Sequence, residues 1–343
     1  MDDIPCLFTP KLRRVVGPIV LALAALAVFA DALAQTPKPL ARIGMVVPVA
    51  DESTSRKLPI IRSLLAGLAE QGLVEGRDFT IERRFTAGHP ERFAALTQEL
   101  VDAKVDLLVV GVCGAPLDAA RRATQTIPIV VPTCNDDLVE LGIVRSLNHP
   151  GGNITGLSKL TPELAPKRLQ LLLQAVPKAR RIAVLWNPGY SEFKADWREL
   201  QAAARTLGVT LVPFEFRLPD DLDPVFAAIA RERPDALMMF SDQLAFVFAA
   251  RVARLAADKR LPAIFAFREV ADAGGLMSYG PNIVDMWHQS AAQVARILRG
   301  EKAGDLPIEQ PTRFELVINR KSASDLGIKI PQSLLLQADA VVE

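Results

Sequence analysis

The sequence predicts an α/β protein with two similar lobes, in which helices cover both faces of parallel sheets. From residue 42 onward, short apolar runs typical of strands alternate with amphipathic segments typical of helices. This order occurs twice, and Val105-Asp106-Leu107-Leu108 in the first half corresponds to Pro234-Asp235-Ala236-Leu237 in the second. Strands that alternate with helices form parallel sheets through right-handed crossovers. We therefore expect two Rossmann-like lobes.

The first half begins with a short apolar strand. Gly72 follows the first helical pattern, as is usual at a helix C-terminus. The expected strands are 42–47, 80–85, 106–112 and 127–132, and the expected helices are 59–70, 90–103 and 115–124.

The second half repeats this pattern, and Gly208 again closes the first helix. Ile127-Pro128-Ile129 in the first half also corresponds to Leu261-Pro262-Ala263 in the second. The expected strands are 181–186, 210–216, 236–240 and 261–267, and the expected helices are 192–207, 224–233 and 244–258.

Several segments are expected to cross between the lobes and form a multi-strand hinge. A cluster of turn-forming residues over 147–156 predicts the first crossing, and glycines around a short strand over 274–281 predict the second. A helix over 283–299 would return to the first lobe, and a strand over 314–319 would cross once more. The expected parts are a signal peptide (1–34), an N-terminal lobe (35–155 plus 281–310) and a C-terminal lobe (156–280 plus 311–343).

The N-terminal segment has the order of a secretory signal. Lys11, Arg13 and Arg14 precede an apolar run over 15–30, and Ala32-Leu33-Ala34 then supplies small residues. The run is shorter than the roughly 20 residues that a membrane span needs. We expect cleavage after Ala34 and a periplasmic protein, with an uncleaved anchor as the alternative.

Composition and motifs argue against nucleic-acid binding, metal binding and catalysis. The net charge is +1, so electrostatics give no reason to expect nucleic acid as a partner. The three histidines, His89, His149 and His288, lack metal-ligand spacing, and we expect no metal or other cofactor. The sequence also lacks a Gly-x-Ser-x-Gly elbow, a phosphate loop and a dinucleotide fingerprint. We therefore expect a protein that is not an enzyme.

A ligand is expected at the carboxyl ends of the strands. In open parallel sheets ligands bind there, and two facing lobes would share one cleft. The loops that follow the expected strands are 48–55, 112–115 and 132–137 in the first lobe, and 187–191, 241–243 and 267–269 in the second.

Four blocks in the same order resemble a known family. They are SLNHPGGNITG (146–156), ARRIAVLWNP (179–188), FREVADAGGLMSYG (267–280) and PTRFELVIN (311–319). Together they resemble the ABC-transporter substrate-binding proteins, including the tryptophan/tyrosine-type members. The resemblance implies a type I periplasmic binding protein, whose lobes close on a small molecule and present it to ABC permease subunits in the inner membrane. Some relatives bind aromatic amino acids.

The chain departs from the amino-acid-binding members at two places. Those members tend to carry a Thr-Asp-Asn-type triplet where this chain has Ser241-Asp242-Gln243. Cys113 and Cys134 stand in loops where small polar residues are usual.

Two charged side chains are the main ligand candidates in the second lobe. Arg268 could grip a ligand carboxylate through two parallel hydrogen bonds, or pair with Glu269 or Asp272 at the start of a helix. Asp242, with Ser241 and Gln243 beside it, could hold a ligand ammonium or simply cap the helix that starts near Leu244.

Turn and aromatic residues are further candidates. Asn187, Tyr190 and Ser191 could bond to a ligand or stack on it, or serve only as turn residues. Trp186, Phe267 and Tyr279 could form an aromatic wall, or pack in the core.

In the first lobe, Cys113, Gly114 and Asp136 are expected at the cleft, and Asp137 is the weaker alternative to Asp136. Cys113 and Cys134 end neighbouring strands, so a disulfide is conceivable, with free buried thiols as the alternative.

These observations predict the periplasmic component of an ABC importer. It would act as a monomer and bind a small organic molecule, such as an amino acid or an aromatic or carboxylate compound. Closure would follow from stronger ligand contacts in the closed form. The alternatives are a sensory module without transport, a periplasmic hydrolase or lyase, and the ligand domain of a transcription regulator.

Overall fold

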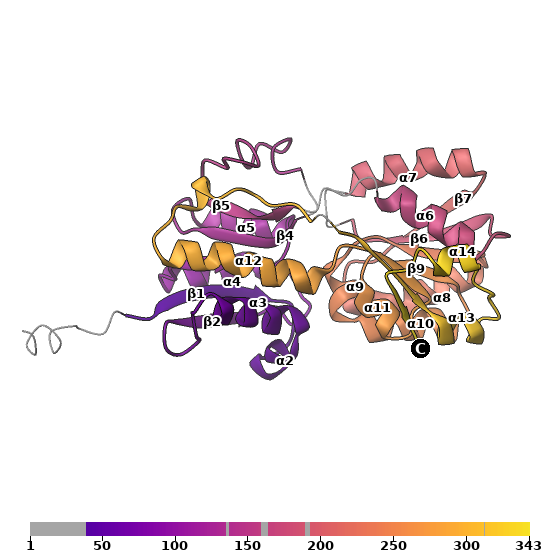
Figure 1. Ribbon diagram of the computed structural model, residues 1–343, viewed down its shortest axis with the longest axis horizontal. Helices are drawn as coiled ribbons and strands as arrows, with labels where there is room; N and C mark the ends of the chain where they lie inside the picture. The colour runs from indigo at the N-terminus through magenta and orange to yellow at the C-terminus, as the bar shows by residue number, and fades with distance from the viewer. Residues whose placement is uncertain (1–38, 135–136, 159–163, 189–192, 312) are drawn as a thin grey trace, which may run out of the picture. The chain divides into compact units, whose positions relative to one another are not determined.

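The chain folds into two sheets with helices on their faces, as the sequence predicts (Figure 1). The computed structural model describes residues 39–134, 137–158, 164–188, 193–311 and 313–343. All strand pairs of the five-stranded sheet are parallel, and so are those of the seven-stranded sheet apart from β10 with β11. The expectation of two α/β lobes with mostly parallel sheets is confirmed.

The first sheet has the strand order β2-β1-β3-β4-β5. Its strands are β1 (Ala41–Val47), β2 (Phe79–Phe85), β3 (Leu107–Val109), β4 (Ile129–Cys134) and β5 (Ile154–Ser158). The helices between them are α2 (Glu52–Lys57), α3 (Pro59–Glu70), η1 (Pro90–Arg92), α4 (Phe93–Asp102) and α5 (Ala115–Ala123). Because β5 belongs to this sheet, the chain leaves it after Ser158, beyond the boundary expected at residue 155.

The second sheet has the order β12-β11-β10-β9-β8-β6-β7. Its strands are β6 (Arg181–Trp186), β7 (Thr210–Glu215), β8 (Ala236–Met239), β9 (Ala263–Phe265), β10 (Met277–Gly280), β11 (Glu315–Asn319) and β12 (Ala340–Val342). Its helices are α6 (Leu164–Ala175), α7 (Phe193–Leu207), η2 (Pro219–Asp221), α8 (Leu222–Glu232), α9 (Gln243–Val247), α10 (Ala249–Asp258), α11 (Arg268–Asp272), α13 (Arg320–Asp325) and α14 (Gln332–Leu335).

Two elements differ from those that the sequence predicts. The segment expected as the loop 48–55 turns into helix α2, because the Asp51 carboxylate accepts a hydrogen bond from the Thr54 N–H at 2.8 Å. The single helix expected over 244–258 is divided into α9 and α10 at Phe248, whose backbone angles (φ −106°, ψ 30°) leave the helical region.

The sequence repeat corresponds to a repeated contact. The Asp106 carboxylate accepts a hydrogen bond at 2.7 Å from the backbone N–H of Arg42, at the start of β1. The equivalent Asp235 carboxylate accepts hydrogen bonds from the N–H groups of Arg180 and Arg181, at 2.7 and 2.8 Å, at the start of β6. In each lobe the aspartate therefore fixes the amino end of a neighbouring strand.

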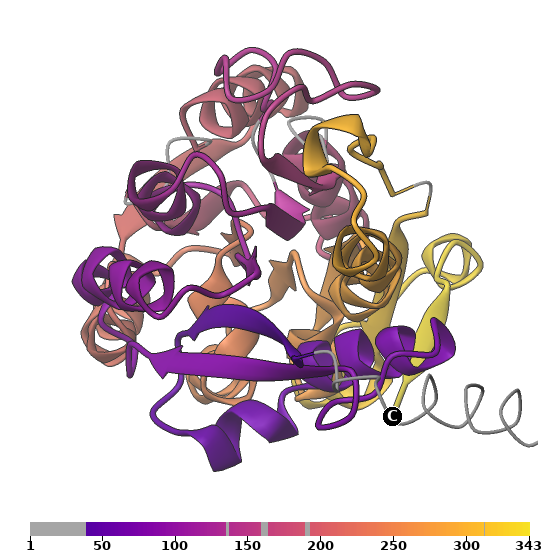
Figure 2. The same ribbon diagram turned by 90° about the vertical axis from the view of Figure 1, so that its left-hand side faces the viewer.

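Helix α12 (Ile283–Leu298) follows β10 of the second sheet but packs beside α3 of the first, as Figures 1 and 2 show. The Ser63 hydroxyl donates a hydrogen bond to the Val284 carbonyl at 2.8 Å. Gly67 lets the helices approach, since a Cβ there would lie 2.7 Å from that of Ala291. A short turn, η3 (Ala303–Asp305), follows α12.

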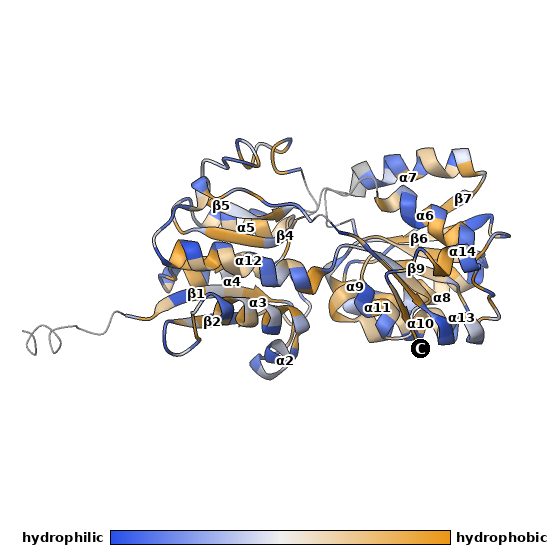
Figure 3. Cartoon of the chain, viewed as in Figure 1, coloured by the Kyte–Doolittle hydropathy of each residue, from blue (hydrophilic) through white to orange (hydrophobic). Residues whose placement is uncertain are grey.

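Apolar residues concentrate in the strands, whereas helices such as α7 carry polar residues among apolar ones (Figure 3). The largest fully buried side chains include Phe79, Phe216, Phe226, Phe240 and Phe265. Within the residues that the structure describes, no helix is long and apolar enough to cross a membrane.

Candidate functional site

The carboxyl ends of β6, β8 and β9, which are neighbours in the second sheet, bring several predicted residues together. Asn187 follows β6 and Asp242 follows β8, and the Asn187 Nδ2 donates a hydrogen bond to the Asp242 Oδ2 at 3.0 Å. The other oxygen, Oδ1, accepts a hydrogen bond from the Leu244 N–H at 2.6 Å. Asp242 is therefore the N-cap of α9, which was the alternative expectation for this residue.

Burial gives Asp242 unusual electrostatics. Its exposed fraction is only 3%, and burial raises the pKa of its carboxyl to about 6, against the opposing hydrogen bonds from Leu244, Asn187 and Ala245. Within the described part of the chain no cationic group pairs with this carboxylate. A buried carboxylate without such a partner is costly, so a ligand cation beside it would be stabilised. The neighbouring Ser241 is also buried.

Two aromatic rings lie at the same edge. Phe267 follows β9, and its ring meets that of Phe246 on α9 in an edge-to-face arrangement, with 5.7 Å between centroids and 87° between planes. Phe246 was missed at the sequence level because nothing separates it from the other apolar residues of the helix expected there. An aromatic pair of this kind offers both a ring face and a ring edge to a neighbour.

The other two residues of the expected aromatic wall pack elsewhere. Trp186 and Tyr279 lie against the apolar cluster beneath α6 and α7, and not with Phe267. The Tyr279 ring is next to Phe314, with 6.4 Å between centroids. For Trp186 and Tyr279 the structure therefore shows the core-packing alternative.

Arg268 is engaged in ion pairs. Its guanidinium lies 3.1 Å from the Asp272 carboxylate and 3.5 Å from that of Glu315 on β11. Glu315 also accepts a hydrogen bond from Asn282, the N-cap of α12, at 3.2 Å. The helix-start ion pair that was the alternative for Arg268 is thus present, with Asp272 as the partner.

Glu269 is a charged residue of this edge that the sequence analysis did not select as a ligand contact. Burial raises the pKa of its carboxyl to about 7, and the nearby Asp272 acts in the same direction. The sequence shows only a glutamate in the first turn of a helix, which is a common stabilising position, so no sequence signal separates it from a surface residue.

The carboxyl edge of the first sheet is held by a disulfide between Cys113 and Cys134, with 4.9 Å between their Cα atoms. Cys113 follows β3 and Cys134 ends β4, so the bond joins two neighbouring strand ends. Gly114 is the N-cap of α5, and its φ of 74° is a conformation that favours glycine. Of the two alternatives left open for Cys113 and Cys134, the structure has the disulfide and not the free thiols.

Of the remaining predicted residues, the structure describes some and not others. Asp136, Tyr190 and Ser191 lie outside the described residues. Gln243 begins α9, but its side chain is also outside them. Asp137 accepts hydrogen bonds from the N–H groups of Val139 and Glu140, at 2.9 and 3.0 Å, and so closes a turn.

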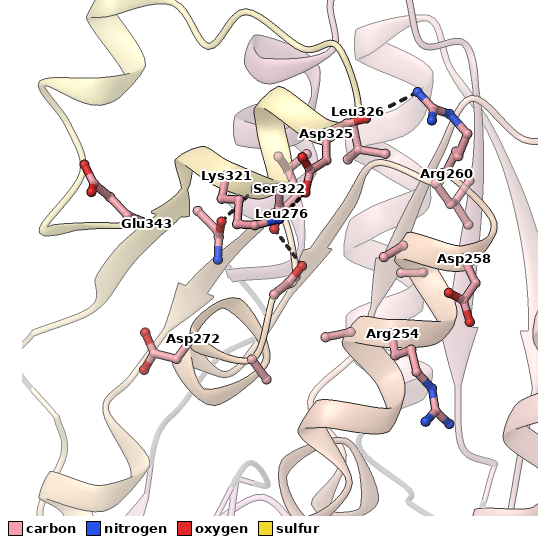
Figure 4. A pocket seen from close by; sticks show the side chains of 18 residues that line it. Arg254, Asp258, Arg260, Asp272, Leu276, Lys321, Ser322, Asp325, Leu326 and Glu343 are labelled. Carbon is pink, nitrogen blue, oxygen red and sulfur yellow. Dashed lines mark hydrogen bonds and ion pairs between the residues drawn. The ribbon is translucent and has the colours of Figure 1, made fainter.

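A surface pocket of about 560 Å³ lies elsewhere on the second lobe, among α10, α11 and α13 (Figure 4). Its labelled side chains carry charges of both signs, including Arg254, Asp258 and Lys321. None of the predicted ligand residues that the structure describes lines it. Lys321 there already pairs with Asp325 at 2.6 Å, so the pocket gives no reason to move the candidate site.

Comparisons with known proteins agree with this architecture. A tyrosine-binding protein of Clostridioides difficile (strain R20291) is 23% identical over 268 residues, which cover 78% of this chain and 76% of that protein. The structure of an ABC domain in complex with L-Trp from Streptococcus pneumonia is 25% identical, with a TM-score of 0.77, and the match covers 88% of this chain and all of that one. A conserved domain protein of Vibrio cholerae is 28% identical, with a TM-score of 0.77 and coverage of 88% and 99%.

The family comparison extends over both lobes. The model of the family described as "ABC transporter substrate binding protein" matches residues 42–342. This is a family of substrate-binding proteins and not of enzymes, and its solved neighbours have the type I periplasmic binding fold. Because the match takes in both sheets and all their connections, the chain belongs to the ABC transporter substrate-binding protein family.

Proposed function

We propose that this protein is the periplasmic binding component of an ABC importer and captures an amino acid with an aromatic side chain. It would be exported by its N-terminal signal, cleaved after Ala34, and act as a monomer without catalysis. Its partners would be the small-molecule ligand and the ABC permease subunits. The carboxyl edges of both sheets would contribute contacts, and closure would follow from the stronger binding of the closed form.

The observation that carries the ligand class is the buried Asp242 carboxylate. Among the residues that the structure describes, it accepts hydrogen bonds from neutral N–H groups, those of Asn187 and of the start of α9. A carboxylate has about four acceptor positions, so it can accept further bonds from a ligand ammonium. Such an ammonium would supply the positive charge that favours the ionised form.

Two further features support an aromatic amino acid. Phe246 and Phe267 lie at the same sheet edge as Asp242 and would pack against an aromatic side chain. Relatives that match most of this chain are described as tyrosine-binding or were solved with L-Trp. A ligand carboxylate would then be bound by other groups, among which Asn187, Tyr190, Ser191 and Arg268 stay candidates.

Calorimetric titration of the chain from residue 35 onward tests this proposal. The probes are L-tryptophan, L-tyrosine, L-phenylalanine and benzoate, which has the ring and carboxylate but no ammonium. We expect binding of at least one amino acid and none of benzoate. Asp242→Asn removes the charge and is expected to weaken binding about 100-fold, since a buried charge pair is worth roughly 2–5 kcal/mol.

Asp235→Asn is the matched control. It makes the same substitution in the same lobe, but Asp235 lies at the opposite end of the sheet, where it accepts hydrogen bonds from the backbone N–H groups of Arg180 and Arg181. It is expected to bind like the wild type. Binding of benzoate alone, or equal affinities for wild type and Asp242→Asn, would exclude ammonium recognition at Asp242.

A separate experiment distinguishes import from sensing. Uptake of the labelled ligand is measured in cells with and without the gene. Loss of uptake in the deletion strain, restored by the wild type but not by Asp242→Asn, is expected for an importer. Unchanged uptake would favour a sensory role.

A further inference from the structure

The first turn of α12 is bonded to both lobes. Asn282, the N-cap of this helix, donates a hydrogen bond from its Nδ2 to the Glu315 Oε1 of β11 at 3.2 Å. In the same turn, the Val284 carbonyl accepts the hydrogen bond from Ser63 on α3, in the first lobe. The chain is therefore held by one lobe and then by the other within a single helical turn.

The pairing of β10 with β11 ends just before Asn282. Gly280 is opposite Glu315 in the last pair of this antiparallel ladder. The next residue, Pro281, has no N–H group and cannot continue the ladder. A side-chain hydrogen bond from Asn282 to Glu315 then holds the two segments together beyond the last backbone pair.

Glu315 also connects this point to the candidate ligand edge. Its other carboxylate oxygen, Oε2, lies 3.5 Å from the Arg268 guanidinium. Arg268 begins α11 and directly follows Phe267, one of the two rings at that edge. One carboxylate therefore links the start of α12 to the start of α11.

A second N-cap asparagine has the same chemistry but bonds within the second lobe. The Asn319 Oδ1 accepts a hydrogen bond from the Ser322 N–H at 2.8 Å, and its Nδ2 donates to the Ala271 carbonyl at 3.0 Å. The Asn282 Oδ1 likewise accepts from the Asp285 N–H at 2.9 Å. The two asparagines differ in what the amide nitrogen contacts, because only that of Asn282 joins two segments that cross between the lobes.

We propose that Asn282 and Glu315 are positioning residues that make two crossings, the one from β10 into α12 and the one into β11, move together when the lobes close. Crossing segments that move separately allow the lobes more relative orientations than segments that move together. The link to ligand capture rests on the proposed function, whereas the coupling is measured without ligand. Neither residue contacts the ligand in this scheme.

Distances between two spin labels, one in each lobe, test the assignment on the chain from residue 35 onward. The labels are attached through Ala95→Cys on α4 and Ala227→Cys on α8, which are exposed positions. Cys113 and Cys134 are bonded to each other and do not take up a thiol-reactive label.

Asn282→Asp is the informative variant. It keeps a capping oxygen for α12 but replaces the donor to Glu315 by an acceptor. Without ligand, its distance distribution should be about twice as wide as that of the wild type, because more lobe orientations become populated. Adding Glu315→Gln supplies a donor on the other side of the contact, so the double variant should return to the wild-type width.

Asn319→Asp is the matched control. It makes the same substitution at an N-cap whose amide bonds within the second lobe. It should lower the melting temperature without widening the distribution. Equal widening in Asn319→Asp, no widening in Asn282→Asp, or no recovery in the double variant would overturn the assignment.

Titration with L-tryptophan separates this assignment from the proposed function. A wider distribution lowers the fraction of binding-competent protein, so Asn282→Asp should bind about threefold more weakly and the double variant should recover. Equal affinities beside a widened distribution would show that the coupling does not serve ligand capture. If the widths follow the expected pattern but the wild type binds no amino acid, the coupling stands and the proposed ligand class is wrong.

A second variant covers the case in which Asn282→Asp does not fold. Asn282→Ser also keeps a capping oxygen, and it lacks the amide that contacts Glu315. Its distance distribution should widen in the same way. A wild-type width in Asn282→Ser would reject the coupling.

Discussion

The carboxyl edges of the two sheets are held in different ways. In the first lobe a covalent bond between Cys113 and Cys134 joins the ends of β3 and β4. In the second lobe the ends of β6 and β8 are joined by a hydrogen bond between Asn187 and the buried carboxylate of Asp242. The link in the first lobe is therefore a covalent bond that does not titrate, whereas burial raises the pKa of the carboxyl in the second link to about 6. The second edge is the better suited to recognising a charged ligand.

In both lobes two neighbouring strands pack closely at a glycine. Disrupting this packing should lower the stability of the protein more than any other change proposed here. A Cβ on Gly156 of β5 would lie 2.1 Å from the Val131 carbonyl oxygen, and one on Gly280 of β10 would lie 2.2 Å from that of Ala266. Gly156→Ala and Gly280→Ala should each lower the free energy of unfolding by about 4 kcal/mol, measured by urea denaturation. Gly152→Ala is the control, because its Cβ would meet open space. Losses below about 1 kcal/mol would contradict the packing described.

Removing the disulfide tests how much the covalent bond stabilises the first lobe. Cys113→Ser with Cys134→Ser should lower the free energy of unfolding by about 3 kcal/mol, because the bond closes a loop with a sequence separation of 21 residues. The double variant should also become insensitive to dithiothreitol, whereas the wild type should lose the same stability when reduced. Equal stability of reduced and oxidised wild type would show that the bond does not constrain the lobe.

The sequence predicted most of the fold because its signals are local and repeated. Strand and helix periodicities, together with the aspartates at 106 and 235, located both lobes. The features that the sequence did not predict depend on contacts between residues far apart in the chain, or on the cap of a single helix. Helix α2 depends on the cap at Asp51, and the antiparallel pairing of β10 with β11 depends on where the chain crosses between the lobes.

The candidate site was predictable in position but not in detail. Strand ends identified Asn187, Asp242 and Phe267, because the carboxyl edge of a parallel sheet is fixed by topology. The detail that was missed is which side chains already have a partner within the protein. Those partners come from residues that are distant in the sequence. Arg268 meets Glu315 from β11, and no local spacing indicates that contact.

The pH dependence of stability should differ between Asp242 and the disulfide edge. Because the pKa of Asp242 is raised in the folded state from 3.8 to about 6, the folded protein binds a proton between about pH 4 and 6 that the unfolded chain does not. The free energy of unfolding should therefore fall as pH rises through this range, by up to about 3 kcal/mol from this residue. Denaturation of wild type and Asp242→Asn at several pH values measures the difference. A difference that is constant from pH 4 to 7 would show that the carboxyl is not perturbed.

Glu269 should also make stability fall as pH rises, by less than Asp242 does. Its pKa rises from 4.5 to about 7, so the wild type should lose stability relative to Glu269→Gln as pH increases through that range. Because the side chain keeps some contact with water, screening limits the change to about 1 kcal/mol. The same pH series of denaturation curves measures it. An effect as large as that of Asp242 would mean that the Glu269 carboxyl is as fully shielded from water as that of Asp242.

Arg268→Ala should have the smallest effect, and it completes the comparison of the two edges. The guanidinium is 38% exposed and its ion pairs with Asp272 and Glu315 are partly solvated, so their loss should cost less than about 1 kcal/mol of stability. Since two carboxylates already occupy this cation, a ligand carboxylate would have to displace one of them, and we expect the affinity for L-tryptophan to change less than tenfold. Titration of this variant beside Asp242→Asn gives the test. A loss for Arg268→Ala as large as for Asp242→Asn would mean that the ligand exchanges with the ion pairs, and the second edge would then recognise both charges of an amino acid.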